Sequence, residues 1–245
     1  MNLPIAKALG YKTVDKIYNY TFILDPNSVG NLFNWEPSYA SKTPLLDIKN
    51  YSNLKPFCNH TSVGSTRFSF SPSLKPKHKS NIILETFKSR DYIKWRYIDH
   101  PFFDYQVSFI TNVDEKVIFY LVWRLVDFNG ASLCRVVDCD YIPDHTSINI
   151  FAGCLIYDLV LHLQSMDVSY IDCFTNNLFL SQALLNVGFL CDVDSIFPNL
   201  IDPLDFTRPK LNCEYYVDPN ICSCPTMINM RGDGDQDRPN QSIFS

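Results

Sequence analysis

Residues 168–189, which read VSYIDCFTNNLFLSQALLNVGF, combine a strand pattern with a helix pattern. The short apolar run Val168–Phe174 predicts a buried strand. Apolar residues then recur at helical spacing from Leu178 to Val187, after two asparagines of a type that favours a helix start. Gly188 follows, as glycine commonly does where a helix ends. This stretch therefore predicts a strand–helix unit that packs on a larger sheet.

The residues upstream extend this sheet. Tight turns separate three predicted strands, which are Tyr105–Thr111, Val117–Asp127 and Leu133–Tyr141. Between the second and the third strand, Asn129-Gly130 is a strong hairpin signal. A helix from Ile148 to about Gln164 then separates the third strand from the strand at Val168, which suggests a crossover to a parallel neighbour. We therefore expect an α/β fold whose mixed, mostly antiparallel sheet is flanked by helices. Function is expected where the strands separate after the third strand.

The composition changes along the chain. The segment 26–80 is rich in Pro, Ser, Asn and Lys and predicts an extended connector without regular elements. Residues 81–230 are patterned as a folded domain, which opens with a helix that ends before His100-Pro101. Residues 231–245 form a polar tail, for which a solvated terminus is the ordinary interpretation.

Charge and hydropathy exclude several classes of protein. The 245 residues are 46% hydrophobic and carry a net charge of −5, which supports a buried core and disfavours nucleic acid as a partner. No apolar run is long enough to span a bilayer, and the first residues lack the apolar core of a signal peptide. Nine irregularly spaced cysteines fit reduced thiols, so we expect a cytoplasmic protein.

The sequence offers two weak metal patterns. Cys222-x-Cys224 lacks a second closely spaced pair of zinc ligands. Asp233, Asp235 and Asp237 alternate as in a calcium loop, but the glycine and the glutamate of such a loop are missing. We therefore predict no metal site.

The order strand, asparagine, helix and Gly-Phe resembles the GNAT acyltransferase superfamily. Asn177 and Gly188 lie eleven positions apart, as in that family, and the resemblance covers residues 81–230. It implies a GNAT-like sheet, acetyl-CoA as the acyl donor and a small amine as the acceptor.

Four further motifs resemble a group of GNAT-like proteins found with bacterial surface-polysaccharide and nonulosonic-acid genes: Trp95-Arg96-Tyr97 with His100-Pro101, Arg135-Val-Val-Asp138, Phe197-Pro198-Asn199 and residues 232–240. Members of this group commonly carry two GNAT-like units in tandem. Residues 1–25, with a predicted strand at Val14–Leu24, are similar to the end of a first unit. The resemblance implies a remnant of a preceding unit, and a separate GNAT-like unit or a second copy of this chain as a partner.

The resemblance implies N-acyl transfer from acyl-CoA to an amino-sugar intermediate of surface polysaccharide biosynthesis. This chemistry needs a base for the amine and an acid for the departing thiolate. Asp138 and Asp140, two apart on one strand face, are candidate bases. Leu184 stands where the family has its acidic tyrosine, so Tyr157 is the candidate acid.

The remaining candidates bind ligands. Thr146 and Ser147, before the long helix, and Asn177 are candidates for binding the cofactor, because helix N-termini favour phosphate. Candidates for substrate binding lie on several elements and on the tail: Arg96, His100, Arg124, Arg135, Asp235, Gln236 and Arg238.

Structural interpretations stay open beside these roles. Asp138 and Asp140 can pair with Arg124 or Arg135, the cofactor candidates can cap helices, and His100 can complement a helix C-terminus. Asp172, mid-strand, needs a partner if it is buried. Leu184 and the glycine-poor turn before Ser147 also keep open an alternative function, a non-catalytic GNAT-like binding or partner module derived from a degenerate or split tandem protein.

Overall fold

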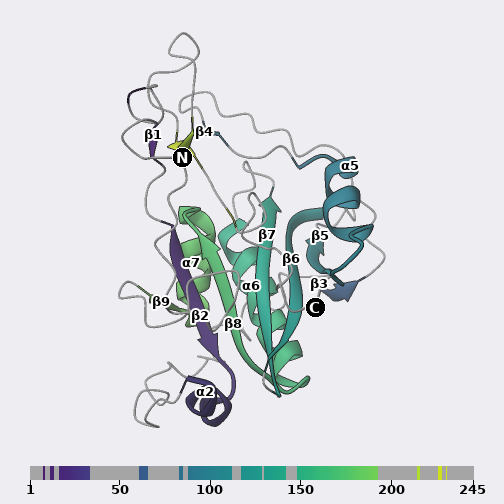
Figure 1. The fold of residues 1–245 in the computed structure, drawn as a ribbon. Coiled ribbons are helices and arrows are strands. Elements are labelled where there is room, and N and C mark those ends of the chain that lie inside the picture. The colour runs from purple at the N-terminus through teal and green to yellow at the C-terminus, as the bar shows by residue number, and fades with distance from the viewer. Residues whose placement is uncertain are drawn as a thin grey trace.

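The computed structural model describes residues 8, 12–13, 17–33, 61–65, 83–84, 88–111, 117–128, 130–141, 148–192, 214–215, 226–227 and 230. Most of these residues belong to one sheet and the helices that pack against it (Figure 1).

The described part of this sheet has seven strands in the order β3-β5-β6-β7-β8-β2-β9. Their bounds are, in that order, Thr61–Ser65, Gln106–Thr111, Val117–Phe128, Ala131–Tyr141, Val168–Thr175, Tyr18–Ile23 and Leu190–Asp192. Neighbours are antiparallel except β7 and β8, which are parallel. The predicted fold class, an α/β fold with a mixed, mostly antiparallel sheet flanked by helices, is confirmed.

Strand β2 lies between β8 and β9, although it comes from the N-terminal segment. It pairs with β8 from Tyr18 to Ile23 and with β9 from Asn19 to Thr21, antiparallel in both cases. Tyr20 and Phe22 enter the apolar core with α6 and α7 residues. β2 is therefore an interior strand of the same sheet that the 81–230 segment builds.

Helices α6, Ile148–Gln164, and α7, Leu178–Val187, pack together against one face of the sheet (Figure 1). The Asn177 side chain caps α7 by accepting hydrogen bonds from two backbone N–H groups, and Gly188 ends the helix at φ 107°. A left-handed residue at this position favours glycine. The bounds predicted for both helices are confirmed. None of the helices described is long and apolar enough to cross a membrane.

The opposite face of the sheet carries shorter helices. Helix α5, Arg90–Ile93, continues into a π-helix, Lys94–Ile98, and Tyr97 packs with Val107, Val122 and other residues of β5 to β7. Helix α2, Pro26–Phe33, places Val29 in a separate cluster that includes Ile23 and Tyr170. Two apolar clusters thus occupy different parts of this face.

The prediction that segment 26–80 holds no regular elements is wrong at α2 and β3. Proline at the first position of α2 is compatible with a helix, because the N–H that it lacks would have no intrahelical partner there. The helix predicted before His100 begins later than expected, at Arg90, because Ile83–Leu84 forms strand β4. Strand β4 pairs with β11, Thr226–Met227. Strand β1, Lys12–Thr13, pairs with β10, Glu214–Tyr215, in another two-stranded sheet.

Two backbone positions predict opposite effects on stability. Asp167 has φ 56° and Gly130 has φ 79°, both in the left-handed region. We expect Asp167→Gly to raise the free energy of unfolding by about 1 kcal/mol, and Gly130→Ala to lower it by about 1–2 kcal/mol. A Cβ at Gly130 meets no atom within 4 Å, so its cost is backbone strain alone. Urea unfolding measures both changes in the free energy of unfolding. Changes of the same sign would contradict the left-handed backbone conformation of these two residues.

Tyr20 predicts a loss of stability in alkali. Burial is the main cause that raises the pKa of its phenol to about 12, above its ordinary value near 10. The folded state therefore holds this proton more tightly than the unfolded state. Its contribution to stability is complete below pH 10 and falls as the pH rises from 10 to about 12. The unfolding free energy of the protein should fall relative to that of Tyr20→Phe over this range; a constant difference would contradict the shift.

Candidate functional site

Buried charges gather on the sheet face opposite α6 and α7. Five charged side chains are buried in the described part of the chain: Lys88, Arg124, Arg135, Asp138 and Asp172. Along β7, Cys134 and Val136 pack in the core with α6, so Arg135 between them points to the opposite face. We call this side the polar face. Buried charges are costly unless they are paired, so each needs a partner.

Asp138 is held by two side chains and by the backbone. The Lys88 ammonium lies 2.5 Å from Asp138 Oδ1, and the Tyr97 hydroxyl donates a 2.6 Å hydrogen bond to Oδ2. The Cys139 N–H donates to Oδ1 at 2.8 Å, while Lys88 also donates to the Cys139 carbonyl at 2.7 Å. These contacts stabilise the ionised carboxylate and fix its orientation. The alternative that Asp138 pairs with Arg124 or Arg135 is wrong, because its ionic partner is Lys88.

Arg135 instead pairs with Asp172 across the parallel strands β7 and β8. Arg135 Nη2 lies 3.3 Å from Asp172 Oδ2, and Nε lies 3.4 Å from Oδ1. Both side chains are buried. The expectation that a buried Asp172 needs a partner is confirmed, and the predicted substrate residue Arg135 forms an ion pair inside the sheet.

The parallel strands separate just beyond this pair. Their pairing runs from Ser132 opposite Val168 to Val136 opposite Cys173, and the last five residues of β7 continue without β8. The predicted separation after the third strand is therefore confirmed. On the α6 and α7 side of the gap, the ring of Tyr141 stacks on Phe179 with centroids 4.4 Å apart. This stack joins the end of β7 to the start of α7.

The structure does not bring the predicted base and acid together. Asp140 shares the polar face with Asp138, is partly exposed, and accepts the Tyr141 N–H at 2.8 Å. Tyr157 lies in the core between α6 and the sheet, with Leu184. The carboxylates and Tyr157 are thus on opposite faces of the sheet.

The predicted cofactor residues can be placed only in part. Asn177 Oδ1 accepts the N–H groups of Phe179 and Leu180 at 3.0 and 3.3 Å, so its predicted capping role is confirmed. Thr146 and Ser147 lie outside the described residues. The tail residues Asp235, Gln236 and Arg238 also lie outside them.

Phe103 links two of the predicted substrate residues. The His100 ring stacks on it at 5.1 Å, and the Arg124 guanidinium lies 3.9 Å from its ring centre. His100 Nδ1 accepts the N–H groups of Phe102 and Phe103, so His100 orders the turn that follows the π-helix. Arg96 is separate, with its guanidinium 5.7 Å from the Tyr97 ring centre.

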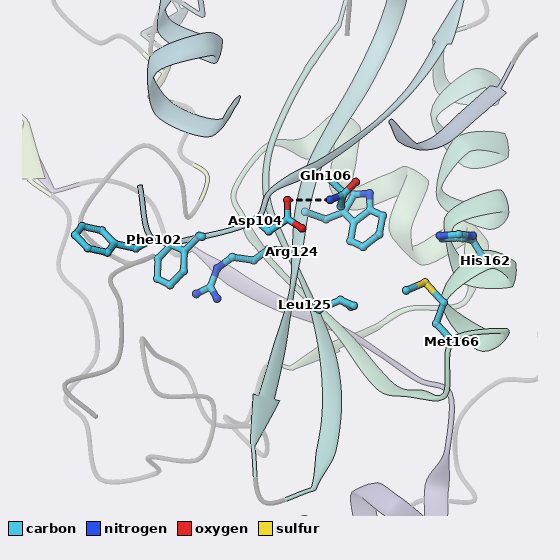
Figure 2. Close-up of a pocket in the computed structure, with 9 residues that line it drawn as sticks. Phe102, Asp104, Gln106, Arg124, Leu125, His162 and Met166 are labelled. Carbon is cyan, nitrogen blue, oxygen red and sulfur yellow. Dashed lines mark hydrogen bonds between the residues drawn. The ribbon is translucent and has the colours of Figure 1, made fainter. Parts of the chain in front are cut away.

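A cavity of about 470 Å³ lies at the other end of α6 from the strand gap (Figure 2). Arg124 and Phe103 line one part of it, and His162 of α6 and Met166, in the turn after α6, lie on the other side of β6 in Figure 2. Asp104 and Gln106 lie between them and share a 3.1 Å hydrogen bond. The seventeen residues of α6 separate this cavity from the gap by about 25 Å.

The sequence offered little sign of two of the residues that build this site. Lys88 precedes α5 in an ordinary polar stretch. Tyr97 belongs to the Trp95-Arg96-Tyr97 motif, whose pattern gives this tyrosine no role. It lies in the π-helix, a conformation that is frequent at functional sites and that the sequence pattern does not reveal.

Two cysteines of β7 are poor nucleophiles. Burial is the main cause that raises the pKa of the Cys134 and Cys139 thiols well above their ordinary value. Both are free thiols. Across the residues described, no group of three or more His, Cys, Asp or Glu side chains is arranged to hold a metal ion.

Comparison with known proteins found no matching family model and no matching curated protein. Among solved structures, Saccharomyces cerevisiae N-myristoyltransferase with bound myristoyl-CoA is similar to this chain at a TM-score of 0.40 and 8% identity, over 71% of this chain and 49% of that one. L-PGS from Bacillus licheniformis is similar at a TM-score of 0.36 and 10% identity, over 70% and 48%. This chain spans about half the length of either structure.

The Asp138 network predicts a large loss of stability on substitution. Asp138→Asn leaves the buried Lys88 charge without its counter-ion, so we expect the free energy of unfolding to fall by about 3–5 kcal/mol. Tyr97→Phe removes one hydrogen bond and should cost about 1 kcal/mol. The matched control is Asp99→Asn, whose partner Lys94 is exposed, and it should change stability by less than about 1 kcal/mol. Equal effects at Asp138 and Asp99, in guanidinium unfolding, would contradict this account.

Proposed function

We propose that this chain transfers an acyl group from acyl-CoA, with acetyl-CoA as the donor, to the amino group of an amino-sugar intermediate of surface polysaccharide biosynthesis. The observation that supports this most is the separation of β7 from β8 beside a face that holds five buried charged side chains. A gap between strands can admit an extended pantetheine chain. Buried charges orient a polar acceptor because they keep their direction while the substrate binds.

Two helix N-termini flank the gap and suit the phosphates of CoA. Helix α6 begins at Ile148, after the chain leaves β7, and α7 begins at Leu178, directly after β8. The helix dipole favours anions at both positions, although Asn177 already accepts the N–H groups of Phe179 and Leu180 at the start of α7. In this proposal Thr146, Ser147 and Asn177 help to bind the cofactor at these ends.

The base for the amine is Asp140 in this proposal. Asp138 is fully buried and bound by Lys88 and Tyr97, so it holds its neighbours in position. Asp140 is two residues nearer the end of β7, on the same face, and is partly exposed. Tyr157 is on the other face, so the thiolate leaves without a proton from that side chain.

Isothermal titration with acetyl-CoA tests the proposal directly. We expect one site per chain, and no heat at high ligand concentration would overturn acyl transfer. Asp140→Asn should lower kcat by about 10²–10⁴-fold on an amino-sugar acceptor, because general base catalysis contributes about that factor. Its affinity for acetyl-CoA should stay unchanged, and unchanged turnover would remove Asp140 as the base.

The alternative, a non-catalytic GNAT-like binding or partner module, has its own support. Tyr141 and Phe179 stack across one side of the gap, and the buried Leu184 has no proton to transfer. If this stack closes the gap to ligands, acetyl-CoA will give no heat with the protein. Phe179→Ala then distinguishes two cases. If the stack closes an existing slot, the variant will bind acetyl-CoA; if the chain has no site for acetyl-CoA, the variant will not bind it either.

The partner and the location belong to the same proposal. A cytoplasmic enzyme of this kind would act as a homodimer or beside a separate GNAT-like unit. Sedimentation of the purified chain, alone and with the product of a neighbouring GNAT-like gene, distinguishes these assemblies.

A further inference from the structure

Strand β6 extends beyond β5, and this leaves one of its edges open. The pairing of β5 with β6 reaches only as far as Gln106 opposite Trp123, while β6 continues to Phe128. Strand β7 occupies the other edge of β6 along this whole length. Within the described part of the chain, residues 124–127 of β6 therefore have no strand beside them on the β5 side.

The open edge of β6 offers backbone groups for hydrogen bonding. Alternate residues of a strand direct their N–H and C=O groups to opposite sides. Two of the four residues 124–127 therefore direct theirs toward the place beyond the start of β5. The chain that leads into β5 does not pair with them, since Phe103, Asp104 and Tyr105 belong to no strand and Tyr105 packs with Tyr97. Open backbone groups of this kind are a template for an added strand.

The cavity of about 470 Å³ lies around this open edge (Figure 2). Trp123 and Leu125 pack with the core under α6, whereas Arg124, between them, points to the opposite face and contacts Phe103. All four residues line the cavity. A cavity that is lined from both faces of a sheet passes around an edge, and β7 closes the other edge of β6. An added strand would therefore have space for side chains on both faces.

The walls of the cavity favour large apolar side chains. Phe102 and Met166 line it from opposite sides of β6 and are 57% and 42% exposed (Figure 2). Exposed apolar surface beside a cavity is typical of an interaction site. Side chains alternate between the faces of a strand, so successive residues of an added strand would reach these two walls in turn.

Carboxylates surround the open edge. Asp104 lines the cavity, Asp127 belongs to the open part of β6, and Asp167 lies in the turn after α6. All three are exposed, and none forms an ion pair with another described residue. The basic side chains of the cavity, Arg124 and His162, lie against aromatic rings of its wall. A second copy of this chain would bring two sets of carboxylates together, whereas a basic segment complements them.

We propose that the open edge of β6 binds an extended segment of another protein, which adds as a strand along residues 124–127. Backbone hydrogen bonds supply the affinity, and the cavity walls select apolar side chains at successive positions. Lysine or arginine residues beside these positions pair with the carboxylates around the edge. The site lies about 25 Å from the strand gap, so it does not depend on acyl transfer.

Fluorescence anisotropy with labelled peptides tests this proposal. The probes are short peptides of Val, Leu and Thr with lysines at both ends. Two control sets carry glutamates instead of the lysines, or methyl groups on the backbone nitrogens of the lysine peptides. We expect only the unmethylated lysine peptides to bind, because methylation removes the N–H groups that pair with β6. Added salt should weaken this binding, and the bound peptide should slow hydrogen exchange at residues 124–127.

Matched variants test the two parts of the recognition surface. Met166→Asn removes apolar wall and should weaken binding of the lysine peptides about five- to tenfold. Leu185→Asn, on α7 and 44% exposed, is its control and should bind them unchanged. Asp127→Asn should weaken binding about two- to fivefold, while Asp91→Asn, exposed on α5, should not.

Several results would overturn the proposal. One is the absence of binding by the lysine peptides at millimolar concentration. Equal binding of methylated and unmethylated peptides would exclude strand addition, and equal binding of lysine and glutamate peptides would exclude a basic partner. A dimer in sedimentation that protects residues 124–127 from exchange without any peptide would identify a second copy as the occupant instead.

Discussion

The parallel pairing of β7 with β8 is short, and the site depends on where it stops. Five residues of β7, Ser132–Val136, lie along β8, and the next five leave it. Antiparallel neighbours hold each strand on its other side, β6 beside β7 and β2 beside β8, so the two can diverge while both stay in the sheet. The separation thus gives the sheet an opening that needs no missing strand.

The polar face explains why charged residues are buried beside this opening. The pair of Arg135 with Asp172 lies at the last levels of parallel pairing, and Lys88 with Asp138 lies just beyond them. Buried ion pairs stabilise a fold weakly compared with apolar residues of the same size. Their concentration on one face, while the face under α6 and α7 is apolar, is what the proposed function requires, since it needs fixed charges near a ligand.

Local patterns predicted the elements, and long-range contacts decided what the sequence did not reveal. Residues 168–189 hold their own strand, cap and helix, and β6 pairs with β7 from Phe128 opposite Ala131, where a hairpin was expected, so both were predicted correctly. The place of β2 between β8 and β9 could not be predicted, because its partners lie about 150 residues away and each pairing depends on the whole sheet. The ion pair at Asp138 could not be predicted either, because its partner Lys88 lies about 50 residues earlier and no spacing in the sequence reveals the contact.

Hydrogen exchange with and without acetyl-CoA tests the central claim, that the gap between β7 and β8 receives the acyl donor. We predict that acetyl-CoA slows exchange at the amides of Val137–Tyr141 and of Phe174–Phe179, which border the gap. The amides of Leu125–Asp127, beside the distant cavity, should exchange at the same rate in both samples. Unchanged exchange on both borders of the gap under saturating acetyl-CoA would contradict the account.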